Sequence, residues 1–257
     1  MLLLTNATAT LLDPGISFSL WLTARVVLLT LALHLIAGLL LGYLLSRNPF
    51  PGRGLLDAFV TLPLVFPPIA TGFALLLLFG RQGLLGSWLE SMDLGLIFTF
   101  PGVVTAAFIA GLPLVVKPIQ TAMESAALRL GEVARTLGKN EFKIFFLVLI
   151  PNIRRALATG LTLGLGRSLG EVGITLMLGG NIAGKTNTLS LEIYNAVFSG
   201  DFQRAGVLSV LLGLISLGIF FMLRRLSHRC PADKPPRPNT NKTMSQPSQA
   251  QHSTHLP

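Results

Sequence analysis

The sequence predicts an all-α integral membrane protein with about five transmembrane helices. Hydrophobic residues make up 51% of the 257 residues and charged residues only 12%, whereas a soluble domain usually carries about 25% charged residues. The mean hydropathy is +0.66, and long apolar stretches contain no charge at all. The net charge of +9 is typical of a membrane protein whose basic residues gather on its cytoplasmic side. We expect no nucleic-acid binding, because the basic residues form no stripe with interleaved aromatic residues.

Five segments are apolar and long enough to be spans, since a helix needs roughly 20 apolar residues to cross the ~30 Å hydrocarbon core. They are residues 26–45, 60–79, 98–116, 157–178 and 205–223. Pro67 and Pro68 lie in the second of them and either bend that helix or mark its start near the inner surface.

The distribution of basic residues predicts the orientation. With the N-terminus outside, most of the 20 basic residues fall in three inner segments, 47–53, 117–155 and 224–242. The outer loops then hold only Arg81, Lys185 and Arg204. Such an excess of Lys and Arg on one side marks the cytoplasmic face.

The two ends of the chain lie outside the membrane domain, which we place at residues 17–229. Residues 1–16 are expected to form an external segment that is not a signal peptide, because it lacks a basic start and Asp13-Pro14 interrupts its apolar run. Residues 230–257 are rich in Pro, Ser, Thr, Asn and Gln and predict a disordered cytoplasmic tail. The single cysteine, Cys230, has no partner for a disulfide and makes no metal cluster.

The inner loop at 117–155 contains a charged stretch that no membrane span would tolerate, Gly131 to Pro151. Residues 133–137 favour helix, and Gly138 is a natural break. Phenylalanine and leucine then recur at helical spacing. The pattern predicts two short helices with a bend at the inner membrane surface. An amphipathic helix that merely rests among lipid headgroups would show the same periodicity.

The order of residues in this loop resembles the EAA loop of ABC importer permeases. Glu132 is followed by Ala134, Gly138 comes six residues after the glutamate, and Pro151 comes thirteen residues after that glycine. Val133 departs from the usual alanine, which is a mild apolar change. The resemblance implies the type I ABC importer permease fold with this loop as its cytoplasmic coupling helix.

In that family the coupling helix docks in a groove on a separate ATP-binding subunit. The resemblance therefore implies that Glu132, Ala134 and Arg135 lie at the docking end and that Gly138 permits the bend. It also implies a non-catalytic chain that binds no cofactor, works as a homodimer with two ATP-binding subunits, and uses ATP on those partners. We expect it in the inner or plasma membrane of a prokaryote, as a multi-pass protein with its C-terminus in the cytoplasm.

The resemblance extends over residues 15–226 and indicates the cargo. The segments 55–86 and 166–182 are similar to the permease subunit of molybdate importers, and more loosely to tungstate and sulfate/thiosulfate permeases. These systems receive a tetrahedral oxyanion from an external binding protein. We expect molybdate, with tungstate or sulfate/thiosulfate as alternatives.

Two charged residues in the fourth span, Arg167 and Glu171, are four positions apart and would share one face of a helix. Neither is expected to face lipid, where an ionised group costs at least a few kcal/mol. They could form a structural pair, a gate or intersubunit contact, or a proton relay. The many glycines around them, such as Gly160 and Gly164, would let helices approach closely, so this span is the candidate lining of the pore.

The outer part of the same span offers groups that suit a dianion. An oxyanion prefers backbone N–H donors and hydroxyls with few acidic neighbours. Candidates for the pore and its external mouth are Thr175, Gly179, Gly180 and Asn181.

The stretch GGNIAGKT, residues 179–186, also matches the phosphate-binding loop of nucleotidases. A membrane-anchored nucleotidase would need a second motif of several apolar residues ending in Asp, which the sequence lacks. A proton-coupled secondary carrier would show inverted repeats and more acidic residues inside the membrane. Both alternatives are weaker than the permease.

Overall fold

The computed structural model describes a helical protein over most of the chain. All regular structure in the described residues is helical, which confirms the predicted fold class. Glu132, Ala134, Arg135 and the predicted tail at 230–257 lie outside the described residues. The described residues are 13–47, 50–92, 95–127, 130, 136–138 and 140–228.

The first span is helix α2, Pro14–Ser46, of 33 residues. It begins twelve residues before the predicted span, because Asp13 and Pro14 start the helix rather than interrupt it. The Asp13 carboxylate accepts a hydrogen bond from the Gly15 N–H at 2.8 Å, and proline is well suited to the first helical position.

The second predicted span is divided into α3 (Arg53–Val65) and α4 (Pro68–Phe79). Phe66 and Pro67 have extended backbone between them. Pro67 and Pro68 have no N–H to continue the helical ladder, and each disfavours helical backbone in the residue before it. The predicted span is therefore divided by a complete break, and Pro68 begins α4, which was the alternative to a bend.

Helix α6 (Phe100–Ala122) is the centre of the molecule and packs most extensively against α9 and α2. It continues into a short π-helix, η1 (Met123–Ala127). After the loop come α8 (Glu141–Ile144) and a second π-helix, η2 (Phe145–Leu149), which runs directly into α9 (Ile150–Leu169).

The helix predicted over 157–178 is interrupted at residues 170–172, which we call the α9–α10 junction. Helix α10 (Gly173–Gly179) follows and packs against α4 and α6. The chain ends its described part with α11 (Leu189–Phe198) and the long α12 (Phe202–His228).

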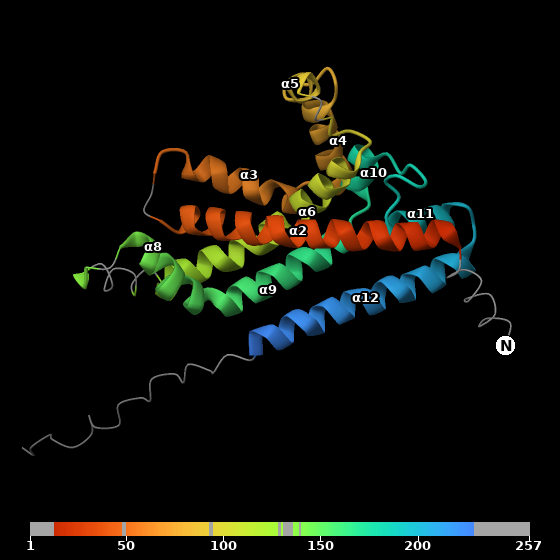
Figure 1. Ribbon diagram of the computed structural model, residues 1–257. Helices are drawn as coiled ribbons and strands as arrows, with labels where there is room; N and C mark the ends of the chain where they lie inside the picture. Colours follow the sequence, from red (N-terminus) through yellow and green to blue (C-terminus); the bar gives the residue numbers. More distant parts are fainter. Residues whose placement is uncertain are drawn as a thin grey trace, which may run out of the picture.

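Figure 1 shows α2, α6, α9 and α12 as a layer of long helices, with α4 and the short α5 (Gly86–Ser91) projecting from it. Within the described residues, four helical segments are long and apolar enough to cross a membrane: Pro14–Ser46, Phe100–Ser125, Phe145–Leu169 and Phe202–Arg225. Exposed apolar side chains recur on one face of α12, at Val210, Leu214, Leu217 and Phe221. Such a face suits contact with lipid.

Candidate functional site

The α9–α10 junction holds a buried acidic residue, Glu171, which is only 2% exposed. Its Oε1 accepts a hydrogen bond from the Ile174 N–H at 2.7 Å, in the first turn of α10. Its Oε2 forms an ion pair with the Arg167 guanidinium. Burying an isolated carboxylate is strongly unfavourable unless it is paired and hydrogen-bonded, so these two contacts are what keep the charge in place.

The Arg167–Glu171 pair spans the break between two helices. Arg167 lies in the last turn of α9, with its side chain 30% exposed, and Glu171 lies beyond the end of that helix. The predicted contact is therefore present, but the assumption that both residues belong to one continuous helix was wrong. Through the Ile174 N–H, Glu171 connects the end of α9 to the first turn of α10.

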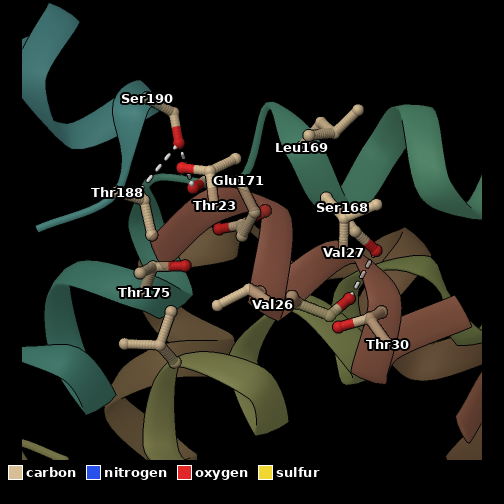
Figure 2. A pocket seen from close by; sticks show the side chains of 12 residues that line it. Thr23, Val26, Val27, Thr30, Ser168, Leu169, Glu171, Thr175, Thr188 and Ser190 are labelled. Carbon is tan, nitrogen blue, oxygen red and sulfur yellow. Dashed lines mark hydrogen bonds between the residues drawn. The ribbon is translucent and has the colours of Figure 1, made fainter. Parts of the chain in front are cut away.

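A small cavity, the junction cavity, lies beside Glu171 between α2, α6, α9, α10 and α11. Figure 2 shows hydroxyl groups of four of these elements around it, among them the predicted Thr175. The volume is about 20 Å³, which is room for one water molecule, since a water needs roughly 10–15 Å³ on the same measure. A tetrahedral oxyanion does not fit there in this conformation.

The hydroxyls that α2 contributes were missed at the sequence level. Thr23 donates to the Ser19 carbonyl at 2.7 Å and accepts from the Leu189 N–H at 3.0 Å. Thr30 is fully buried, and its hydroxyl has no hydrogen-bond partner among the described residues. Ser19, Thr23, Thr30 and His34 are all buried and share one helical face by their spacing. The sequence signal that could have revealed this face was the recurrence of polar residues at helical spacing within the apolar helix α2.

His34 lies inside the bundle and is fully buried. Its Nε2 lies 2.9 Å from the Phe108 carbonyl oxygen of α6, and the two rings are 5.4 Å apart. This contact ties α2 to α6 one turn away from Thr30.

The other predicted pore residues lie at the far end of α10. Gly180 ends that helix with a φ of +76°, and a Cβ there would lie 2.3 Å from the Phe98 ring. Asn181 also has a positive φ, +51°, and exchanges amide hydrogen bonds with Asn195 of α11 at 2.7 and 3.1 Å. The Asn181 amide is thus engaged with α11 through one of its two N–H groups and its oxygen.

Part of the predicted coupling loop is described. Gly138 has a φ of +72°, the left-handed conformation that glycine adopts most readily, which is compatible with the predicted bend. Pro151 lies in the first turn of α9. Ile144 and Leu149 are buried in a cluster with Val115 of α6, which fixes the end of the loop to the central helix.

Two ion pairs on α3 were not predicted. The Arg53 guanidinium contacts Glu124 of η1 at 2.8 Å, and Lys117 of α6 contacts Asp57 at 2.5 Å. Both join α3 to the segment of α6 that leads into the loop. Lys117 was placed at the start of the loop, but it lies inside α6.

The comparisons with known proteins agree on one class of protein. Residues 35–229 match the family described as "Binding-protein-dependent transport system inner membrane component". The molybdenum transport system permease protein ModB of Escherichia coli K12 is 35% identical, with 80% of this chain and 92% of that protein covered. ModB of Azotobacter vinelandii is 37% identical, with 79% and 90% covered. The sulfate transport system permease protein CysW of E. coli K12 is 35% identical, with 83% and 75% covered.

A solved structure shares the fold. The crystal structure of a bacterial ABC transporter involved in the import of the acidic polysaccharide alginate superposes with a TM-score of 0.71. It covers 88% of this chain and 84% of the matched chain, at 17% sequence identity.

Proposed function

Since this chain belongs to the family of binding-protein-dependent transport system inner membrane components and is thus a permease subunit of an ABC importer, we propose that it imports a tetrahedral oxyanion, with molybdate as the preferred cargo. The observation that supports molybdate is the fraction of each relative's length that the match covers. The two molybdenum permeases are covered over 92% and 90% of their length, whereas the sulfate permease CysW of E. coli is covered over 75%. The motifs at 55–86 and 166–182 support the same cargo.

Sulfate is the second candidate. CysW of Synechocystis and CysW of E. coli are 33% and 35% identical to this chain, so identity alone does not separate the two anions. Sulfate, tungstate and molybdate share the charge and tetrahedral shape that a permease can sense, and selection among them then rests largely with the external binding protein.

The chain itself performs no chemistry in this proposal. ATP is hydrolysed on two ATP-binding subunits, and the loop around Glu132, Ala134 and Arg135 docks on them. A homodimer of permeases and an external oxyanion-binding protein complete the importer. A solved relative of the fold, the bacterial alginate transporter, is described in complex with a periplasmic protein bound to an alginate pentasaccharide.

The packing supports a mechanical route from the loop to the α9–α10 junction. Ile144 and Leu149 anchor the end of the loop on α6, and η2 continues into α9 without a break. Helix α9 has 20 residues and is thus about 30 Å long. A displacement of the loop would move α9 as a rod and act on the Arg167–Glu171 pair at its other end.

We favour a gate over a proton relay for that pair. Each carboxylate oxygen of Glu171 already has a donor, Ile174 N–H or Arg167. Taking up a proton would neutralise Glu171 and break its ion pair with Arg167, which would leave the guanidinium without its partner. A pair that bridges two helices is better suited to hold or release α10, whose far end carries Gly179, Gly180 and Asn181.

The test of the cargo is a competition assay in proteoliposomes that contain the permease, its ATP-binding subunit and the cognate binding protein. Labelled molybdate is supplied with ATP inside, and unlabelled tungstate or sulfate is added outside. We expect molybdate and tungstate to compete at low concentration and sulfate only at much higher concentration. Equal competition by sulfate would overturn the preference for molybdate while leaving the oxyanion class intact.

A further inference from the structure

We propose that a basic cavity beside α4 and α5 is an entry site for the tetrahedral dianion, an assignment that rests on the proposed function and its orientation. This α4–α5 cavity has a volume of about 370 Å³. It lies between the end of α4, the short α5, the segment that leads into α6 and the loop after α10. Arg81, Glu90, Thr99 and Lys185 are among its lining residues.

The cavity brings together two cations that are far apart in the sequence. Arg81 and Lys185 are two of the three basic residues that the predicted topology places outside. The Arg81 side chain is 87% exposed, and within the described residues its recorded polar contact is to Glu90, from Nε at 3.1 Å. That contact leaves the two Nη groups of the guanidinium to donate to an anion. Lys185 is exposed and has no acidic partner in the described part of the chain.

The charges of the lining favour a dianion. Arg81 and Lys185 together exceed the charge of Glu90 by one unit. An arginine fork matches two oxygens of one tetrahedral anion, and the lysine ammonium adds a mobile point charge. Because the Arg81–Glu90 pair is solvent-exposed, it is weak, and a divalent anion can compete with the glutamate for the guanidinium.

Thr99 has a structural task in this cavity. Its hydroxyl lies 2.8 Å from the Leu96 carbonyl and 3.1 Å from the Gly95 carbonyl, so it fixes the wall of the cavity. Recognition is therefore electrostatic, through two flexible side chains. This suits an entry site that must release its anion again.

Size separates this cavity from the one at the α9–α10 junction. The junction cavity, at about 20 Å³, has room for one water at most, whereas about 370 Å³ admits an oxyanion with part of its hydration shell. Cargo can therefore wait in the α4–α5 cavity while the path beside Glu171 is closed.

The wall of the cavity is fastened to α10. The Phe98 N–H donates to the Leu178 carbonyl at 2.7 Å, and the Phe98 ring lies where a side chain at Gly180 would be. The Lys185 N–H donates to the Ile182 carbonyl at 3.1 Å, just beyond the end of the same helix. Residues 184–186, the Gly-Lys-Thr that matches a nucleotide-binding loop, thus place Lys185 beside a cavity large enough for an oxyanion. This cavity lies at the end of α10 opposite Glu171.

The first test is chemical protection of Lys185 in the purified permease–ATPase complex in detergent. An amine-reactive ester is added with molybdate, tungstate or sulfate, or with chloride at the same ionic strength, and modification is measured by mass spectrometry. We expect the dianions to slow modification of Lys185 several-fold and to leave Lys143, at the other end of the bundle, unaffected. Equal rates in molybdate and chloride would overturn the site.

The second test uses uptake kinetics in proteoliposomes. Arg81→Gln combined with Lys185→Gln should raise the KM for the oxyanion several-fold at low salt with little change in kcat, and the effect should shrink as salt screens the charges. Lys185→Arg should retain most of the affinity. Arg225→Gln at the end of α12 changes the net charge of the chain by one unit at a site distant from the cavity and should leave KM unchanged.

The outcomes separate the site from the function. Oxyanion uptake with no protection of Lys185 and an unchanged KM in the double variant would overturn the site alone. Protection of Lys185 by dianions in a complex that imports no oxyanion would support the site and overturn the proposed cargo.

Discussion

At the scale of single residues, the contacts of Glu171 explain most about the break between α9 and α10. Its spacing from Arg167 predicted their contact, and the structure confirms it. The spacing could not reveal two further contacts of Glu171. Its side chain accepts a hydrogen bond from the Ile174 N–H, and its backbone carbonyl accepts one from the Ser190 hydroxyl. Those contacts come from elements distant in sequence or from a break in the helix. They are invisible to a helical periodicity argument.

We predict that Glu171→Ala destabilises the protein more than Glu171→Gln does. Alanine leaves Arg167 and the Ile174 N–H without their partner, whereas glutamine can still accept one hydrogen bond. Removing one member of a buried pair costs about 3–5 kcal/mol, and the partial exposure of Arg167 reduces this to roughly 2 kcal/mol. Thermal unfolding of the complex in detergent measures the difference, and equal Tm values for the two variants would contradict it.

Thr23 and Thr30 provide a matched pair on one helix. Thr23→Val removes the acceptor of the buried Leu189 N–H, which should cost about 1–3 kcal/mol. Thr30→Val replaces a hydroxyl that has no partner among the described residues and should be close to neutral. Comparable losses of Tm for both would mean that Thr30 holds a water in the junction cavity.

At the scale of elements, the two breaks in predicted spans have different causes. Single prolines such as Pro63 and Pro113 lie inside helices here, but the break between α3 and α4 could be predicted, because the adjacent Pro67 and Pro68 together remove two N–H donors and each disfavours helical backbone in the residue before it. The break between α9 and α10 could not, because Gly170 and Val172 are both tolerated in helices. There the carboxylate of Glu171 and the packing of α10 on α4 outweigh local preference.

The conformation of Gly138 in the proposed coupling loop predicts how substitutions there change uptake. Gly138 has a positive φ, and a Cβ there would meet no atom of the described residues within 4 Å, so the backbone conformation is what opposes a side chain. Gly138→Ala should cost roughly 1–2 kcal/mol locally and reduce uptake by shifting the loop. Gly138→Asn should retain more uptake, since asparagine adopts this conformation more readily. Equal uptake rates for the two variants, measured in proteoliposomes, would argue against the bend as the cause.

At the scale of the whole molecule, the sequence predicted the fold class and the family, because apolar length and the loop motif are local signals. It did not predict the α4–α5 cavity, which forms only where Arg81 and Lys185 meet through the packing of α4 against α10. The orientation of the chain and the docking of Glu132 remain predictions. They depend on the membrane and on the partner subunits.

If the proposed function holds, ATP used on a partner subunit drives an oxyanion through this chain. The most direct measurement is the initial rate of molybdate uptake into proteoliposomes that contain the complete complex, with ATP inside and without it. We predict uptake only with ATP, and its loss in Glu132→Lys, which reverses the charge at the proposed docking end. Uptake that continues without ATP would contradict the account.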